Sequence, residues 1–137
     1  MNQDFLALLK QNNLRATHAR MQLFTTLSSA HSPLSAVELS RLCTTIDKAS
    51  VYRTIETFLA IGLILSVTRH WKNLYELASP FVPHHHHMVC IRCGRDEEIQ
   101  SDAIESVIKT LGNQHGFIST GHHFEVTGIC RDCATPL

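Results

Sequence analysis

Two cysteine pairs in the second half of the chain constrain its fold more than any other feature. Each pair has the spacing Cys-x-x-Cys, and 36 residues separate them: Cys90 and Cys93, then Cys130 and Cys133. One such turn holds two thiolates on one side of a loop, so two turns supply the four corners of a tetrahedral zinc site. A redox pair or disulfides are the alternatives, but neither explains two pairs in a chain without signal-peptide features at its N-terminus. We therefore predict a structural Zn²⁺ site.

The charges are divided between the two halves of this 137-residue chain, although the formal net charge is zero. Residues 1–72 carry eight Lys and Arg against four Asp and Glu, and residues 73–137 carry the reverse. The basic half is the candidate nucleic-acid binder, with a chance fluctuation as the alternative. No apolar run is long enough to cross a membrane, and we expect a cytoplasmic protein.

The first half has the pattern of a winged helix-turn-helix. Helices are expected over residues 3–12, 18–28 and 48–60, where apolar residues recur at helical spacing. A further helix is expected to begin after Ser35, with Glu38 at the capping-box position. Strands are expected over 63–68 and 73–77, separated by a polar turn. Helices followed by a β-hairpin predict a DNA-binding domain over residues 1–78.

The second half predicts a smaller domain that contains both helix and strand. Residues 79–83 include two prolines and are interpreted as a hinge. Residues 84–137 follow, with strands expected over 88–91, 97–99 and 117–128 and a helix over 102–112. A domain of this size buries little apolar surface, so a zinc site would stabilise it. The fold class is therefore α+β.

A run of four histidines, His84 to His87, lies between the hinge and the first cysteine pair. In an extended segment alternate side chains point in opposite directions, so the run could serve two metal sites. A solvated histidine run or a purification tag is the alternative. Mixed imidazole and carboxylate ligands suit Fe(II), Zn, Mn, Co or Ni. The other candidate ligands are Glu76, Glu98, Glu105, His122 and His31. Cys43 stands alone and is expected to be a buried apolar residue.

Several short segments, in order along nearly the whole chain, resemble the ferric uptake regulator family of bacterial metal and peroxide sensors. These segments are Leu14-Arg15-x-Thr17-x-x-Arg20, Ser35-Ala36-x-Glu38-Leu39, Ala49-Ser50-Val51-Tyr52-Arg53-Thr54, Tyr75-Glu76-Leu77, His84 to Cys90-x-x-Cys93-Gly94, and Gly121-His122 through Gly128-x-Cys130-x-x-Cys133.

The resemblance implies a homodimeric, metal-activated repressor of metal-homeostasis genes that binds a palindromic, AT-rich operator. It assigns Cys90, Cys93, Cys130 and Cys133 to structural zinc. A regulatory site between the domains is implied for Glu76, His85, His87 and Glu98, with His31 as a candidate fifth ligand. An additional site is implied for His84, His86, Glu105 and His122. The residues expected to contact DNA are Arg15, Arg20, Ser50, Tyr52 and Arg53, against the alternative of an ordinary exposed helix face.

Departures from the family pattern bear on the identity of the metal. His86 stands where the family often has Asp, and His31 lies two residues before the family's histidine position. Glu76 and Glu98 replace the Asp residues of peroxide sensors, which argues against peroxide sensing. Zinc sensors often have a Cys near Glu76, and this chain has none. Iron and zinc are the leading candidates for the second metal, and manganese is third.

Two other functional classes fit the sequence less well. An enzyme would need a substrate pocket and a positioned acid, base or nucleophile, and the chain has no His-Glu-x-x-His or nucleophile motif. A metal-storage or metal-delivery protein would account for the second half but would leave the basic helical half without a role.

Overall fold

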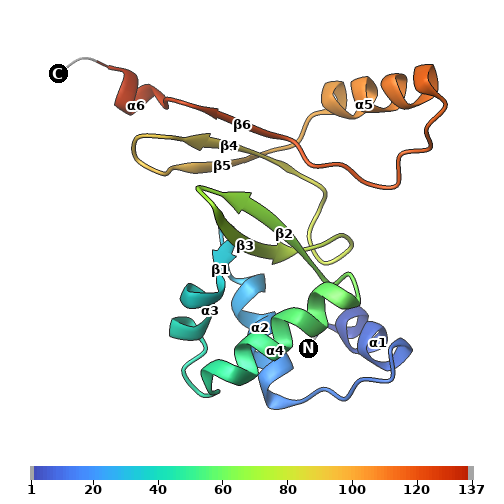
Figure 1. Cartoon of the computed structure of the whole chain (residues 1–137), viewed down its shortest axis with the longest axis vertical. Coiled ribbons are helices and arrows are strands. Elements are labelled where there is room, and N and C mark those ends of the chain that lie inside the picture. The colour runs from blue at the N-terminus through green and yellow to red at the C-terminus, as the bar shows by residue number, and fades with distance from the viewer. Residues whose placement is uncertain (1, 136–137) are drawn as a thin grey trace. The chain divides into compact units, whose positions relative to one another are not determined.

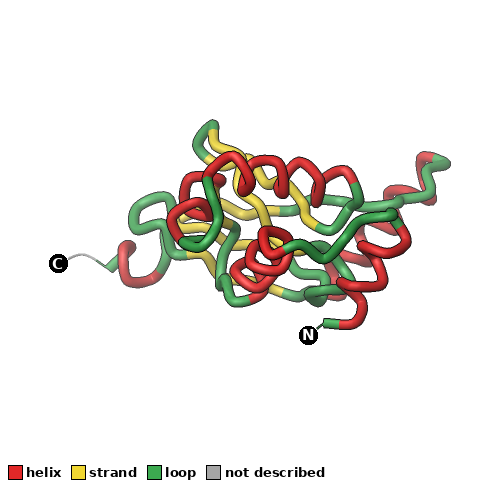
Figure 2. Tube along the Cα trace, turned by 90° about the horizontal axis from the view of Figure 1, so that it is seen from below, coloured by secondary structure: helices red, strands yellow, loops and turns green. Residues whose placement is uncertain are grey.

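The computed structural model of the chain describes residues 2–135, which separate into two compact units, Met1–Pro83 and His84–Leu137 (Figure 1). The predicted domain limits at residues 1 and 137 lie outside the described residues. Both units combine helices with strands (Figure 2), which confirms the α+β fold class. Among the described residues, no helix combines the length and apolar character needed to span a bilayer.

The first unit contains four helices and a three-stranded sheet. Its elements are α1 (Gln3–Gln11), α2 (His18–Ser28), β1 (Leu34–Ser35), α3 (Ala36–Leu42), α4 (Lys48–Ala60), β2 (Ile64–Arg69) and β3 (Lys72–Leu77). The strand order is β1-β3-β2, with antiparallel pairing throughout. The four helices and the hairpin confirm the predicted winged helix-turn-helix pattern. The short strand β1, which pairs Leu34 with Tyr75, was not predicted.

Side chains cap the helices of the first unit as the sequence indicates. The Thr17 hydroxyl accepts from the backbone N–H of Arg20 at the start of α2. At α3 the Ser35 hydroxyl accepts from the N–H of Glu38, and the Glu38 carboxylate accepts from the N–H of Ser35. This reciprocal pair is the predicted capping box, and it satisfies backbone donors that a helix start otherwise leaves unpaired.

Hydrophobic burial holds the first unit together. The Phe5 ring stacks on Phe24 with centroids 4.1 Å apart and meets Phe58 edge-on at 6.0 Å. Phe81, from the predicted hinge segment, packs edge-on against Phe24 at 5.6 Å. Cys43 is fully buried in this core, as predicted. The buried residues of the cluster are Phe5, Leu9, Leu23, Phe24, Leu27, Leu39, Cys43, Val51, Ile55, Phe58, Leu63, Ile64 and Leu77.

The second unit consists of a three-stranded sheet and two helices. Its elements are β4 (His86–Cys90), β5 (Asp96–Ile99), α5 (Asp102–His115), β6 (Glu125–Gly128) and α6 (Arg131–Ala134). Strand β4 lies in the centre, antiparallel to β5 and parallel to β6. The central position of β4 matters because this strand carries histidines into the middle of the sheet.

Two predictions for the second unit are wrong in detail. Helix α5 does not stop at Gly112 but continues to a left-handed cap at Gly116, with φ +71°. A Cβ at Gly112 would lie 2.9 Å from the carbonyl oxygen of Phe117, so glycine is needed here for close approach of the following loop. The last strand begins at Glu125 rather than at Phe117, and His122 therefore lies in an irregular segment, not on a strand.

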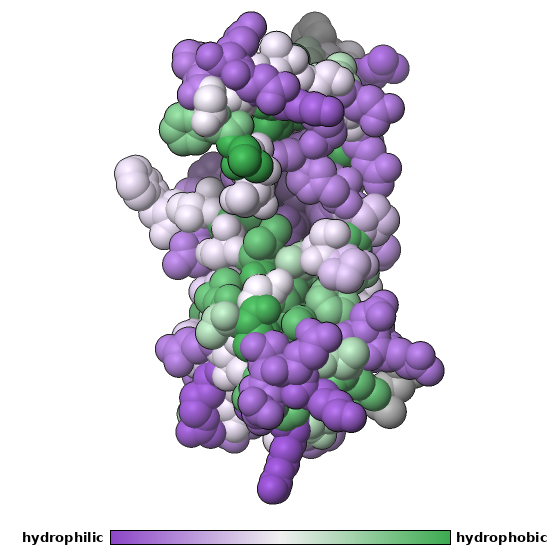
Figure 3. Space-filling model, turned by 90° about the vertical axis from the view of Figure 1, so that its right-hand side faces the viewer, coloured by the Kyte–Doolittle hydropathy of each residue, from purple (hydrophilic) through white to green (hydrophobic). Residues whose placement is uncertain are grey.

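Hydrophobic side chains remain exposed on the second unit. Figure 3 shows a face of the molecule on which hydrophobic residues reach the surface among hydrophilic ones. Apolar side chains form a stripe along α5: Val107 is 58% exposed and Leu111 is 50% exposed, whereas Ile104 and Ile108 are partly buried. Val126 and Ile129 are also exposed. A groove of about 520 Å³ lies in the same unit, and Met88, Val126 and Ile129 are among the residues that line it.

Candidate metal centres and nucleic-acid interface

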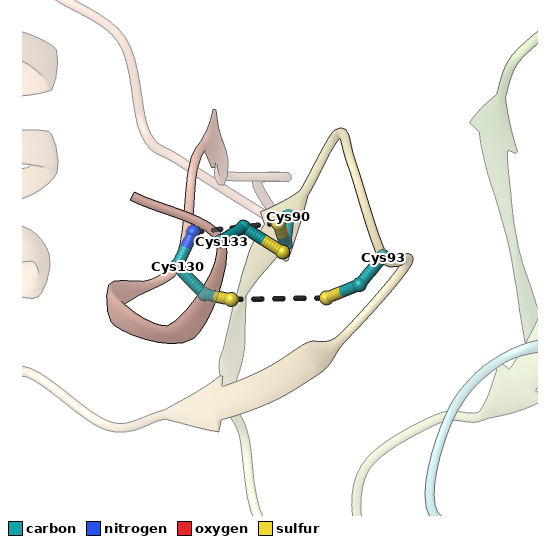
Figure 4. A group of neighbouring side chains, drawn as sticks. All are labelled: Cys90, Cys93, Cys130 and Cys133. Carbon is teal, nitrogen blue, oxygen red and sulfur yellow. Dashed lines mark hydrogen bonds between the residues drawn. The ribbon is translucent and has the colours of Figure 1, made fainter. Parts of the chain in front are cut away.

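The four cysteines of the two pairs converge in the second unit. Cys90 is the last residue of β4, and Cys93 lies in the turn that follows. Cys130 precedes the first residue of α6, and Cys133 lies within that helix. Their sulfur atoms all lie within 4.8 Å of one another and point toward a common centre (Figure 4). The Sγ atoms of Cys93 and Cys130 are 3.7 Å apart. Tetrahedral zinc with Zn–S bonds of about 2.3 Å would separate sulfurs by roughly 3.8 Å, so the cluster fits zinc.

Hydrogen bonds already favour thiolate in part of this cluster. The backbone N–H of Cys130 donates to the Cys90 sulfur over 3.3 Å, and this bond is the largest cause that lowers the pKa of Cys90 to about 6. Hydrogen bonds to the sulfurs of Cys130 and Cys93 raise the pKa of Cys133 to about 12. Four thiolates repel one another without a cation, and a bound divalent metal removes that repulsion.

Arginine side chains tie the two cysteine turns together. The Arg92 guanidinium donates to the carbonyl oxygen of Cys133 over 2.8 Å. Arg95 lies 3.4 Å from a carboxylate oxygen of Asp132. These contacts span more than 35 residues of sequence and place positive charge beside a cluster that is anionic when it holds zinc.

A second cluster gathers three histidines around one carboxylate. A single oxygen of Glu105, on α5, lies 2.8 Å from Nε2 of His86 and 3.2 Å from Nε2 of both His84 and His122. The His86 side chain is 2% exposed, whereas that of His84 is 48% exposed. The hydrogen bond from His86, followed by the charges of His122 and His84, lowers the pKa of Glu105.

This cluster contains all four residues that were predicted as the additional metal site. Their ligand atoms lie within 4.8 Å of one another, although His122 reaches the group from a loop. All four residues belong to the second unit. Three imidazoles and one carboxylate can complete a four-coordinate site for a borderline metal such as Zn²⁺, Co²⁺ or Fe²⁺.

The other two histidines of the run face the opposite side of β4. The rings of His85 and His87 are 4.8 Å apart. Glu98 pairs across the sheet with His87, and its carboxylate lies 4.0 Å from Nε2 of His85. The predicted alternation of the histidine run therefore exists, and the structure brings His85, His87 and Glu98 together on one face.

The remaining predicted ligands of the regulatory site belong to the first unit. Glu76 lies on β3, where it pairs with Leu65 of β2 and is partly buried. His31 is an exposed residue in the bend between α2 and β1.

One polar residue beside the His85 and His87 face was not predicted from the sequence. Asp96, the first residue of β5, lies 2.8 Å from Nδ1 of His87. It is two residues from Glu98, so strand alternation places both on the same face. A strand predicted to begin at Asp96 rather than at Glu97 would have revealed it.

Helix α4 presents the predicted DNA-contact residues at its N-terminal half. Asp47 caps the helix, and its carboxylate accepts from the backbone N–H of Ser50 and from the Ser50 hydroxyl. The Arg53 guanidinium donates to the Ser50 hydroxyl over 3.2 Å. Tyr52 is 39% exposed, and the Lys48 ammonium lies 5.8 Å from its ring centroid. The result is a polar and basic helix face with one aromatic side chain.

Arg15 and Arg20 have different local roles. The Arg20 guanidinium donates to the backbone carbonyl of Arg15 over 2.7 Å. Arg20 therefore braces the loop before α2, and that loop carries Arg15 as an exposed residue.

Comparison with known proteins gives a consistent result over most of the chain. The sequence profile of the Ferric uptake regulator family matches residues 11–127. The Ferric uptake regulation protein of Campylobacter jejuni is 32% identical over 136 residues, which cover 94% of this chain and 85% of that protein.

Solved structures of related proteins have a similar fold. The ferric uptake regulator of Vibrio cholerae superposes with a TM-score of 0.73 at 27% identity and covers 89% of this chain and 96% of that chain. A zinc uptake regulator complexed with zinc and DNA has a TM-score of 0.62 at 27% identity and covers 93% and 88%.

Proposed function

The chain belongs to the ferric uptake regulator family of metal-responsive transcription regulators, which are not enzymes, and we propose that it is a repressor with iron or zinc as its co-repressor. The observation that carries the proposal is the division of ligands along β4. Alternate histidines belong to two different groups of predicted ligands. Those of the Glu105 cluster all belong to the second unit, whereas those of the regulatory site are divided between the two units.

We assign the switch to the face with His85, His87 and Glu98, and the Cys₄ cluster to structural zinc. In this proposal Glu76 of the first unit supplies a further ligand, with His31 as a candidate fifth. Ligands from both units make metal affinity depend on how the units are arranged. The metal-bound state therefore favours the arrangement that binds DNA. DNA in turn tightens metal binding, because the coupling is reciprocal.

The predicted hinge, residues 79–83, is the connection that would bend in this switch. Phe81 and Val82 pack against the core of the first unit. We therefore expect the bending to occur next to His84. A site confined to one unit, such as the Glu105 cluster, cannot act through this route and would serve stability instead.

The ligand types support iron or zinc as the regulatory metal, with manganese as a further alternative. Imidazole nitrogen and carboxylate oxygen together suit borderline divalent metals. The similar zinc uptake regulator binds zinc and DNA. Because the similar proteins include iron, zinc and manganese regulators, the metal has to be identified by titration.

DNA binding is assigned to α4, with Tyr52 and Arg53 directed at base edges and Arg15 at the backbone or minor groove. An exposed arginine can donate to guanine or to phosphate, and an aromatic ring can pack on a thymine methyl group. We propose that two copies bind a palindromic, AT-rich operator in the cytoplasm, one α4 helix in each half-site. The exposed apolar stripe of α5 is the surface that a second copy would cover.

The test is a mobility-shift assay with the full chain and a duplex selected from a random pool. The Cys₄ site is kept filled with zinc, and Fe²⁺, Zn²⁺ or Mn²⁺ is then added to saturation. We expect one of these metals to strengthen specific binding by about 5- to 150-fold. Equal binding with and without every metal would contradict the proposal, and failure to bind any duplex would leave metal storage as the better assignment.

A variant of α4 tests the recognition surface in the same assay. Tyr52→Ala removes an exposed side chain and is expected to weaken specific binding by about 1–3 kcal/mol. The matched control is Glu56→Ala, an exposed residue one turn further along the same helix. An unchanged footprint in Tyr52→Ala would show that α4 is not the recognition helix.

A further inference from the structure

The contact between Asp96 of the edge strand β5 and His87 of the central strand β4 joins two buried side chains. Oδ1 of Asp96 lies 2.8 Å from Nδ1 of His87, and the two side chains are 6% and 2% exposed. The strand register explains the contact, since Asp96 lies opposite Val89 and Glu98 lies opposite His87. Asp96 thus faces the same side of the sheet as His85, His87 and Glu98, diagonally across from His87.

The chemistry of the pair fixes which nitrogen of His87 carries the proton. A carboxylate oxygen accepts hydrogen bonds, so the 2.8 Å contact assigns the donor role to Nδ1 of His87. In a neutral imidazole the lone pair that can bind a metal is then on Nε2. The ring is also held against rotation, because reversing it would replace the donating nitrogen with a carbon atom.

Glu105 in the other cluster shows the opposite arrangement. Its oxygen lies against the Nε2 atoms of His84, His86 and His122, which are the atoms that would bind a metal there. A carboxylate in that position is itself a ligand. Asp96 instead lies on the Nδ1 side of its histidine, which is the position of an outer carboxylate that orients a ligand.

We propose that Asp96 is a positioning residue of the regulatory metal site. Before metal binds, Asp96 holds the His87 ring in the orientation and tautomer in which Nε2 can coordinate the metal. The inference rests on the proposed function, since it assigns His87 to the regulatory site. Carboxylates in this role raise the basicity of the ligand and reduce the reorganisation needed on binding. Their loss typically weakens metal affinity about 10- to 100-fold.

The first measurement needs no regulatory metal. Long-range proton–nitrogen correlation NMR on the isotope-labelled full chain, with zinc in the Cys₄ site only, reports which imidazole nitrogen is protonated. The His87→Gln spectrum identifies the His87 signals by their absence. We expect His87 to be protonated at Nδ1 in the parent protein and to populate both tautomers in Asp96→Ala.

The second measurement is a Co²⁺ titration of the same samples, followed by visible absorption. We expect Asp96→Ala to weaken Co²⁺ binding at this site by at least tenfold. Asp96→Asn is expected to keep the Nδ1 tautomer, because the amide oxygen accepts the same bond, and to lose less affinity. The control is Glu97→Ala, since Glu97 is the next residue on β5 and its side chain is 62% exposed.

Two results would overturn the proposal. The first is a parent-like tautomer and an affinity within twofold of the parent in Asp96→Ala. The second is that Asp96→Asn keeps the tautomer but loses as much Co²⁺ affinity as Asp96→Ala. That result would show that the carboxylate charge of Asp96 acts on the metal directly and not through the orientation of His87. Retention of zinc by the Cys₄ site shows that each variant is folded. Failure of the repressor proposal is seen separately, as metal-independent DNA binding by the parent protein.

Discussion

The two units of this chain are stabilised by different kinds of interaction. The first unit has a continuous buried cluster in which Phe5, Phe24 and Phe58 meet. In the described part of the second unit, the buried hydrophobic residues are Val89 and Cys90, and the buried polar residues are His86 and His87. Helix α5 has no buried residue. Apolar burial thus holds the first unit, whereas we expect the second to depend on metal binding for its stability.

This difference fits the proposal that most of the regulatory ligands belong to the second unit. A metal that contributes much of the folding free energy of a small domain also controls the state of that domain. A unit with a self-sufficient apolar core can keep α4 folded whether or not metal is present. We therefore expect metal removal to destabilise mainly the second unit and core truncation to destabilise mainly the first.

The largest expected effect is the loss of the second unit on removal of structural zinc. Cys130→Ser breaks the four-thiolate set, and structural zinc sites supply apparent binding energies of about 10–16 kcal/mol. We expect the NMR signals of α5 to lose their dispersion while those of α4 persist. Cys43→Ala is the control, since this cysteine lies outside the cluster and should leave zinc stoichiometry unchanged. Retention of the α5 signals without zinc would remove the basis of the comparison.

Core truncation tests the first unit. Phe58 is fully buried, and Phe58→Ala is expected to cost about 3–5 kcal/mol of unfolding free energy through lost burial and a cavity. Urea denaturation should show this loss equally with and without added regulatory metal. Phe117→Ala, at a position that is 74% exposed, should change stability far less. A metal-dependent loss in Phe58→Ala would mean that the units do not fold independently.

The two histidine faces of β4 give a sharper test. The double variant His85→Ala and His87→Ala should remove metal-dependent DNA binding, a coupling of about 1–3 kcal/mol. The matched double variant His84→Ala and His122→Ala alters only the Glu105 cluster and should keep the coupling. Fluorescence anisotropy on one duplex, with and without metal, measures both variants. The reverse pattern would assign the switch to the Glu105 cluster.

The smallest expected effect concerns the capping box of α3. Hydrogen bonds from Ser35 lower the pKa of Glu38 below its ordinary value of 4.5. The carboxylate therefore stabilises the fold above pH 4.5, and this contribution is lost as the pH falls through the lowered pKa. Glu38→Gln should cost about 0.5–1 kcal/mol at neutral pH, and the difference should vanish in acid. Glu56→Gln, on an exposed part of α4, serves as the control in pH-dependent thermal denaturation.

The sequence was sufficient for features that depend on local interactions. The helix start at Ser35 was predictable because its capping box involves residues within one turn. The placement of two thiolates by each Cys-x-x-Cys pair was predictable because the two cysteines of a pair lie in one turn. The alternation of the histidine run followed from strand geometry alone. The motifs also identified the family, which the matched profile confirms.

The tertiary structure decided which distant side chains meet and through which atoms. The sequence placed His122 on a strand, but the structure holds it in the irregular segment that precedes β6. It also gave no sign that Asp96 bonds to Nδ1 of His87 while Glu105 meets Nε2 of His86. The physical reason is that caps and turns depend on neighbours along the chain. A metal ligand's orientation depends instead on sheet register and on contacts made after the strands have paired.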